Sequence, residues 1–198
     1  MKSIKNQSVI ALAAVSAACF AIGCKEKPQK ELPNILWITC EDNSEFFVGC
    51  YGNSFATTPN IDRLAGEGFL YTNAVSAHPV SAPSRNSIIT GAFANSNGNI
   101  QMRSTYPKSE FVRTYPELLR EAGYYCTNNS KTDYNTGSIN PNEIWDESSN
   151  KAHYKNRPEG KPFFAVFNLT ESHESSVNRG QKIPLAELRH DPGKVVLP

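Results

Sequence analysis

A hydroxyl group, a proline and an arginine follow one another closely in the segment Ser81-Ala82-Pro83-Ser84-Arg85. The residues that come next, ending at Thr90-Gly91, predict a short helix over residues 84–90. The N-terminus of a helix carries unpaired N–H groups and a positive dipole, and both favour anions. Arg85 adds a planar guanidinium that suits a tetrahedral oxyanion. The segment therefore predicts an anion-binding site beside a hydroxyl group, although an ordinary loop with a surface arginine is the alternative.

Two neighbouring carboxylates, Glu41 and Asp42, follow the apolar run of residues 34–40. The run does not alternate, which is typical of a parallel strand covered on both faces. Functional residues of parallel sheets lie at the carboxyl ends of the strands. If residues 43–44 turn the chain there, both carboxylates can face one target, and such hard oxygen ligands favour calcium or magnesium over zinc. A solvated acidic turn is the alternative interpretation.

Three further side chains capable of chemistry also follow expected strands. Lys131 and Asp133 come after a strand expected at residues 124–128, and His173 comes after one expected at residues 163–169. A lysine in such a place is commonly a surface charge, and a lone histidine is commonly structural. Their position at the carboxyl ends of buried strands nevertheless makes them candidate site residues.

The remaining pattern alternates between helix and strand. The further expected elements are a helix from Thr58 and Pro59 to Gly66 or Gly68, a strand at residues 69–75, a helix at 114–122 and a polar loop at 130–162. This alternation indicates an α/β fold with a mainly parallel sheet and flanking helices.

The N-terminus is typical of an exported bacterial lipoprotein. A basic start at Lys2 and Lys5 precedes an apolar run that is too short to span a bilayer, and Gly23-Cys24 resembles a lipoprotein cleavage site. We therefore expect a signal peptide at residues 1–23 and lipidation of Cys24. The protein would be held on a bacterial membrane by this anchor, at the outer membrane, the cell surface or the periplasmic face. An ordinary secretory signal is the alternative.

The expected lipidated cysteine opens a polar linker at residues 24–33, and a single domain would occupy residues 34–198. The chain has 198 residues, a net charge of +1 and no basic tract, so we expect no nucleic-acid partner. Cys40, Cys50 and Cys126 lack the paired spacing of a disulfide scaffold or zinc site, which leaves them as core or near-core thiols or allows one Cys40–Cys50 disulfide.

The motif from Ser81 to Arg85 with Thr90-Gly91 resembles the signature of the sulfatase family, in which a Cys or Ser is followed by x-Pro-Ser-Arg and later by Thr-Gly. The other matching segments come in the family's order. They are Glu41-Asp42, Gly49-Cys50-Tyr51-Gly52, Thr58-Pro59-Asn60-Ile61-Asp62, Lys131 and His173. The resemblance implies the N-terminal portion of a catalytic domain with the alkaline-phosphatase-like fold.

The resemblance also implies an activity, the hydrolysis of sulfate esters on sulfated carbohydrates. Ser81 would be oxidised to formylglycine by a maturase, and Glu41, Asp42 and residue 81 would bind a divalent metal, for which we expect Ca²⁺. Arg85 and Lys131 would contact the sulfate. His173 would protonate the leaving alcohol or bind the sulfate, and Asp133, where the family commonly has His, would accept a proton.

Two alternatives stay open at this point. One is a phosphatase or phosphodiesterase of the same superfamily that uses unmodified Ser81. The other is a surface lipoprotein that binds sulfated glycans without turnover. The resemblance places further metal ligands in a later segment, and the chain ends on an apolar stretch at residues 195–198. We therefore expect a truncated domain that is inactive by itself.

Overall fold

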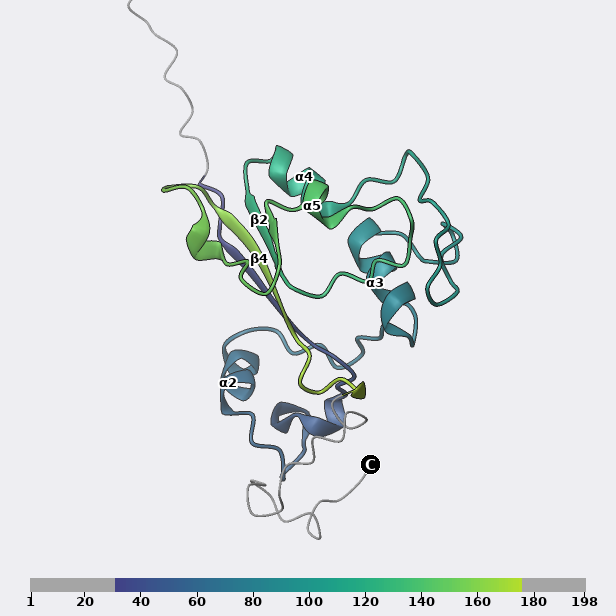
Figure 1. The fold of residues 1–198 in the computed structure, drawn as a ribbon. Coiled ribbons are helices and arrows are strands. Elements are labelled where there is room, and N and C mark those ends of the chain that lie inside the picture. The colour runs from purple at the N-terminus through teal and green to yellow at the C-terminus, as the bar shows by residue number, and fades with distance from the viewer. Residues whose placement is uncertain (1–30, 176–198) are drawn as a thin grey trace, which may run out of the picture. The chain divides into compact units, whose positions relative to one another are not determined.

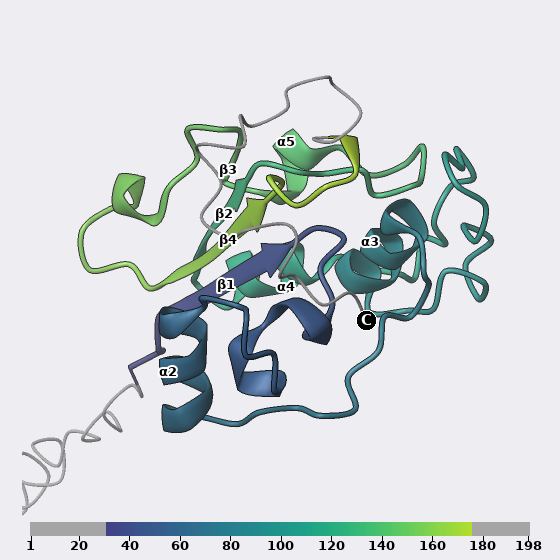
Figure 2. The same cartoon turned by 90° about the horizontal axis from the view of Figure 1, so that it is seen from below.

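Four parallel strands form the sheet of this protein. The computed structural model describes residues 31–175, of which residues 33–175 belong to one compact unit. The strands lie in the order β1 (Ile35–Cys40), β4 (Phe163–Leu169), β2 (Tyr125–Asn129) and β3 (Glu147–Ser148) (Figures 1 and 2). All neighbouring strands are parallel, so the predicted α/β class and parallel sheet are confirmed.

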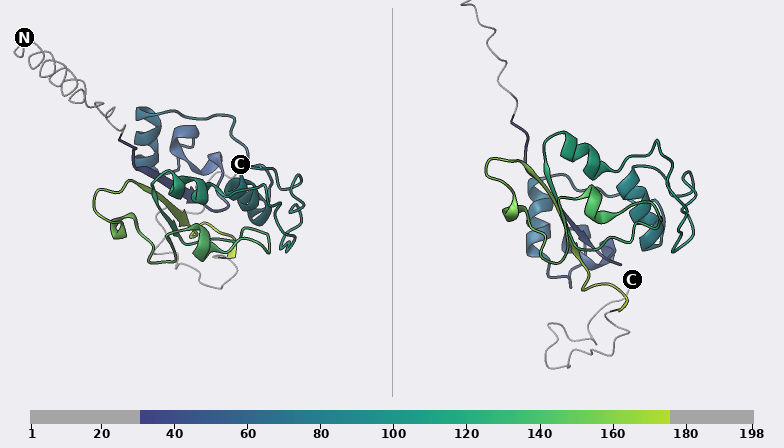
Figure 3. Two further views of the ribbon diagram at one scale, coloured as in Figure 1. Left: turned by 90° about the horizontal axis from the view of Figure 1, so that it is seen from above. Right: turned by 45° about the horizontal axis from the view of Figure 1, so that its top comes forward.

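Helices follow the strands as the alternating pattern predicted. They are α2 (Pro59–Glu67), α3 (Ser81–Thr90), α4 (Tyr115–Glu121) and α5 (Pro141–Ile144), with short 3-10 turns η1 (Glu45–Phe47), η2 (Gly49–Tyr51) and η3 (Tyr154–Asn156). In the right-hand view of Figure 3, α3, α4 and α5 lie together on one side of the strands. The expected helices near residues 58–68 and 114–122 are confirmed.

The helix expected at residues 84–90 begins earlier, at Ser81. Val80, just before it, has extended backbone angles, and Pro83 falls in the first turn. A proline is tolerated in that turn because its missing N–H would have no helical partner. Ser81 is consequently the first helical residue and Arg85 lies one turn beyond it.

An aromatic core joins the sheet to the helices on that side. Tyr115 at the start of α4 packs against Trp37, Trp145 and Phe164, with ring centroids 5.4 to 5.9 Å apart. Trp145 also stacks on Phe164, and its indole Nε1 donates to the Tyr134 hydroxyl over 2.8 Å. Edge-to-face and offset aromatic pairs of this kind add to the stabilisation from buried area.

The prediction of a polar loop at residues 130–162 was wrong in part. This segment contains α5, β3 and η3, and it contributes the buried side chains of Tyr134, Ile144 and Trp145 to the core. Tyr134 has polar neighbours in the sequence, and Ile144 and Trp145 form one short apolar pair, so these residues produce neither the helical nor the strand period from which elements are predicted.

Two expectations about strands were also wrong. Residues 69–75 are irregular, and Phe69 and Val75 are 93% and 92% exposed. Apolar composition favours a strand, but a strand forms only where a partner supplies backbone hydrogen bonds. β1 is not covered on both faces either, because Leu36 and Ile38 are 52% and 54% exposed. Among residues 31–175, β1 pairs only with β4.

The cysteines in the described part of the chain are free thiols. Cys40 is exposed, Cys50 is half-buried and Cys126 is buried, and no Cys40–Cys50 disulfide is formed. No helix within residues 31–175 is long and apolar enough to cross a membrane. The expected signal peptide at residues 1–23 and the lipidation site Cys24 lie outside the described residues.

Candidate active site

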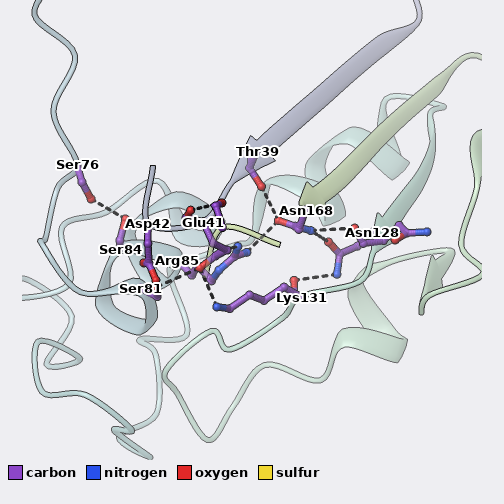
Figure 4. A network of polar contacts seen from close by, with 12 residues as sticks. Thr39, Glu41, Asp42, Ser76, Ser81, Ser84, Arg85, Asn128, Lys131 and Asn168 are labelled. Atoms are coloured by element: carbon purple, nitrogen blue, oxygen red, sulfur yellow. Dashed lines mark hydrogen bonds and ion pairs between the residues drawn. The ribbon is translucent and has the colours of Figure 1, made fainter. Parts of the chain in front are cut away.

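The buried carboxylate of Glu41 is the centre of the candidate site (Figure 4). Glu41 comes directly after β1, and its N–H donates to Leu169 O over 3.1 Å, which continues the β1–β4 ladder by one residue. The side chain is only 6% exposed. The ladder therefore fixes where this carboxylate points, at the carboxyl end of the sheet.

Three groups from separate segments contact this carboxylate. Ser81 Oγ donates to Glu41 Oε2 over 3.2 Å, and Lys131 Nζ lies 2.8 Å from the same oxygen. The guanidinium of Arg85 binds the other oxygen, Oε1. Ser81 and Arg85 come from α3, whereas Lys131 follows β2. Four of the residues predicted for the site thus lie together.

The electrostatic environment keeps Glu41 ionised. Burial by itself raises the pKa of the carboxyl group, but the hydrogen bonds and charges of Lys131 and Arg85 outweigh it and lower the pKa to about 2. Both cations are themselves largely shielded, with side chains 19% and 14% exposed. One carboxylate thus faces two cations, and the three groups together carry an excess of positive charge.

Asparagines at the strand ends orient the arginine. Arg85 Nη1 donates to Asn168 Oδ1 over 3.1 Å, and the hydroxyl of Thr39 donates to the same oxygen over 2.9 Å. Asn168 Nδ2 in turn donates to Asn128 Oδ1 over 3.0 Å. These residues were missed by sequence reasoning. The available signal was a polar side chain near the end of each apolar strand.

Residues 81–85 of the motif form the N-terminal turn of α3, and Thr90-Gly91 form its C-terminal end. Gly91 has φ +65°, a conformation that side chains with Cβ rarely adopt, and α3 ends there. Thr90 Oγ1 donates to Asn86 O over 2.6 Å and satisfies a carbonyl near the helix end. The motif therefore encodes a helix of defined length with the hydroxyl of Ser81 at its start.

Asp42 has a different environment from Glu41. The chain turns after β1 as predicted, but at Asp42 itself, which has a φ of 46°, and not at residues 43–44. Asp42 Oδ2 accepts a hydrogen bond of 2.9 Å from the Glu174 N–H. Both carboxylates line one pocket of about 400 Å³ that also contains Ser81, Arg85 and Lys131. The pair thus shares a pocket, as the turn predicted.

His173 and Asp133 do not line this pocket. His173 is half-buried, and its Nδ1 lies 2.9 Å from Ser175 Oγ. Asp133 is exposed and has a φ of 44°. A different histidine, His78, does line the pocket, and its Nδ1 is buried without a hydrogen-bond partner in the described structure. The predicted roles of His173 and Asp133 therefore stay predictions.

The oxygen donors of the pocket fit a hard divalent cation in kind. Glu41 and Asp42 provide carboxylate oxygens and Ser81 provides a hydroxyl, the ligand type that calcium takes. Within residues 31–175, no group of three or more His, Cys, Asp or Glu side chains could hold a metal ion. Calcium takes roughly six to eight oxygens, so these donors make only part of a calcium site.

Comparison with known proteins identifies the family. The family model described as "Sulfatase" matches residues 33–184. The chain is 41% identical to an ulvan-active sulfatase of Formosa agariphila, across 82% of this chain and 32% of the relative. It is 37% identical to an N-acetylglucosamine-6-O-sulfatase of Bacteroides thetaiotaomicron, across 63% of this chain and 22% of the relative. The chain thus spans about a third or less of the length of these curated relatives.

Solved structures show the same fold. A protein solved in complex with its substrate D-glucosamine-2-N,6-O-disulfate matches with a TM-score of 0.62 and 25% identity, over 73% of this chain and 35% of that chain. A 2-O GAG sulfatase matches with a TM-score of 0.60 and 24% identity, over 72% and 36% of the two chains. The predicted alkaline-phosphatase-like fold is confirmed, and the chain belongs to the sulfatase family.

Proposed function

We propose that the complete protein hydrolyses sulfate esters of carbohydrates, with residue 81 as the nucleophile. The observation that carries this proposal is the contact of one buried carboxylate, Glu41, with Ser81, Arg85 and Lys131 in a single pocket. Several relatives are named as sulfatases of glycans or amino sugars, which supports a sulfated carbohydrate as the substrate class.

Arg85 and Lys131 provide the charge that a sulfate group requires. In the described pocket both cations form ion pairs with the one carboxylate of Glu41. A sulfate ester brings a further negative charge, which increases on the bridging oxygen as the S–O bond breaks. The planar guanidinium of Arg85 can bind two sulfate oxygens, and the ammonium of Lys131 provides a compact point charge.

Ser81 is positioned for modification and attack at the first turn of α3. As hydrated formylglycine, residue 81 would supply a gem-diol, one hydroxyl taking the sulfuryl group and the other expelling sulfate after it loses its proton. Glu41 already accepts a hydrogen bond from the Ser81 hydroxyl, so it can orient the reacting oxygen. A maturase that oxidises Ser81 is part of the proposal.

Glu41, Asp42 and residue 81 would hold a divalent cation, for which we propose Ca²⁺. Bound there, the ion would polarise the sulfate and favour deprotonation of the nucleophile. The oxygen donors of the three residues support calcium over zinc. The remaining ligands would come from outside residues 31–175.

We propose that His173 and Asp133 transfer protons during the reaction. His173 can donate a proton to the leaving alcohol, and Asp133 can accept one from the nucleophile. Asp133 lies two residues after the pocket residue Lys131, and His173 follows β4, whose Asn168 binds Arg85, which supports the proposal. Either role requires its side chain to turn towards the pocket when substrate binds.

Mass spectrometry and turnover test the proposed function together. In a full-length protein purified from its own host, the peptide containing residue 81 should be lighter by two hydrogens and should react with a hydrazide. The same preparation should hydrolyse an aryl sulfate, and Ser81→Ala should abolish turnover. Unmodified Ser81 together with turnover of a phosphate monoester would favour the phosphatase alternative. Glycan binding without turnover would favour the binding protein.

We propose further that the protein is exported and anchored by a lipid on Cys24. The basic start, apolar run and Gly23-Cys24 support this location. Membrane fractionation should recover the protein with membranes, and its N-terminal peptide should begin with acylated Cys24. A soluble protein that retains Met1 would contradict the proposal, and Cys24→Ala provides the matched control.

A further inference from the structure

Four buried asparagines, one of them in α3, form a hydrogen-bonded cluster. Asn86 and Asn99 are completely buried, and Asn97 and Asn135 are at most 9% exposed. Asn97 Nδ2 donates to Asn86 Oδ1 over 2.8 Å, and Asn135 Nδ2 donates to Asn99 O over 2.7 Å. A buried amide is costly unless it is hydrogen-bonded. The cluster therefore constrains the chain segments that it connects.

Asn86 connects this cluster to the candidate site. It follows Arg85 directly in α3, and its Nδ2 donates to the backbone oxygen of Tyr134 over 2.8 Å. Its Oδ1 is occupied by Asn97 at the same time. Because both the nitrogen and the oxygen of this amide are hydrogen-bonded, the Asn86 side chain has a fixed orientation and connects α3 to the segment around Tyr134.

That segment, residues 131–135, carries Lys131. Asp133 and Asn135 both have positive φ, 44° and 54°, a conformation that is uncommon outside glycine. The segment lies outside the sheet ladders, so side-chain amides hold its backbone: Asn128 Nδ2 donates to Lys131 O over 3.2 Å and Asn86 to Tyr134 O. Asn86 is the one of these two that belongs to the helix carrying Ser81.

We propose that Asn86 is a positioning residue that sets the place of the Lys131 ammonium relative to Ser81 and Arg85. This inference rests on the proposed function, in which Lys131 contacts the sulfate. Lys131 must span from the segment after β2 to the pocket, where its Nζ lies 2.8 Å from Glu41. The Asn86 amide binds the backbone of Tyr134, three residues after Lys131. It thereby holds the segment that carries Lys131 against α3, the helix that also carries Ser81.

Covalent labelling of Lys131 tests this role without any need for turnover. In the intact 198-residue chain, labelling of Lys131 by a limiting amine-acylating reagent is compared by peptide mass spectrometry with labelling of exposed Lys155. Asn86→Asp keeps the shape of the side chain but places an oxygen against Tyr134 O, and Asn86→Ala removes the donor without adding charge. Both variants should raise the Lys131 to Lys155 labelling ratio several-fold.

Asn97→Ala is the matched control. It removes a buried hydrogen bond of the same length to the same residue, but it leaves the Asn86–Tyr134 bond in place. Its labelling ratio should stay at the wild-type value. An unchanged ratio in both folded Asn86 variants, or an equal rise in Asn97→Ala, would overturn the proposal. Loss of near-UV circular dichroism in both Asn86 variants would assign Asn86 to stability alone and would overturn it as well.

Because the readout is the exposure of one lysine, the result is independent of whether Ser81 is modified or the protein turns over sulfate. If the full-length protein proves inactive towards sulfate esters while the labelling pattern is as expected, the proposed function is contradicted but the positioning role is kept.

Discussion

Lys131 Nζ lies 2.8 Å from Glu41 Oε2, although the two residues are 90 positions apart in the chain. Arg85 binds the other oxygen of the same carboxylate. Parallel strand order produces this contact, because β2 and β1 flank β4 and all three end at the same edge of the sheet. A single buried carboxylate thus connects the strand end, the helix and the loop that make the site.

Replacing Glu41 by Gln should destabilise the fold. The change removes the charge that compensates Arg85 and Lys131, both of which are largely buried. Breaking a buried ion pair by removing one partner costs about 3 kcal/mol of unfolding free energy. Urea unfolding at pH 7 measures the difference, and Glu45→Gln, at an exposed position, is the control. Equal stability of the two variants would show that the cations find other partners.

Arg85→Lys should lower activity although the positive charge is kept. The guanidinium contacts both Glu41 and Asn168, and an ammonium cannot reproduce this fork. We expect kcat/KM for an aryl sulfate to fall about 100-fold in an active full-length preparation, as for the loss of an oxyanion donor. Arg63→Lys, on the exposed face of α2, should retain wild-type kinetics. Retained activity in Arg85→Lys would mean that charge alone suffices.

The capping box of α4 predicts a pH-dependent contribution to stability. Burial raises the pKa of Glu117, but hydrogen bonds from the Thr114 hydroxyl and N–H outweigh it and lower the pKa below its usual range. Because the pKa of Glu117 is lower in the folded state, the ionised carboxylate stabilises the fold at pH values above its unfolded pKa of about 4.3. This stabilisation is lost as the pH falls through the folded pKa.

Glu117→Gln should therefore reduce the unfolding free energy at pH 7 by at most about 1 kcal/mol, and the difference should shrink below pH 4. Thermal unfolding across this range measures it. Glu110→Gln, exposed in the preceding loop, serves as the control and should show no such trend. If the difference in unfolding free energy persists at low pH, it comes from the hydrogen-bond geometry of the side chain and not from the charge of Glu117.

Two glycine substitutions should have opposite effects on stability. Gly91 has φ +65°, so Gly91→Ala should destabilise by about 1 kcal/mol even though no atom lies within 4 Å of the added Cβ. Gly66 lies inside α2 with open space around it, and Gly66→Ala should stabilise by about 0.5 to 1 kcal/mol. Equal melting temperatures for both variants would contradict the argument that backbone conformation decides the outcome.

Local sequence signals were sufficient for the elements that carry the site. Strand β4 occurs at residues 163–169 as predicted, and β1, β2, α2 and α4 lie within two residues of their expected bounds. Each of these combines an apolar pattern with a terminator such as a capping threonine, a glycine or a turn, and such signals act between neighbouring residues. The motif from Ser81 to Gly91 likewise encodes its own helix.

Tertiary structure alone decided which side chains meet. Residues from different elements meet in the hydrogen bonds of Arg85 with Asn168, of Trp145 with Tyr134 and of Asn86 with Tyr134. It also decided that residues 69–75 form no strand. The sequence by itself determined the type of β1, β2, β4, α2, α3 and α4 and the residues at the strand ends, because these depend on local periodicity and capping. Contacts depend on strand order and on partners distant in the chain, which no local pattern specifies.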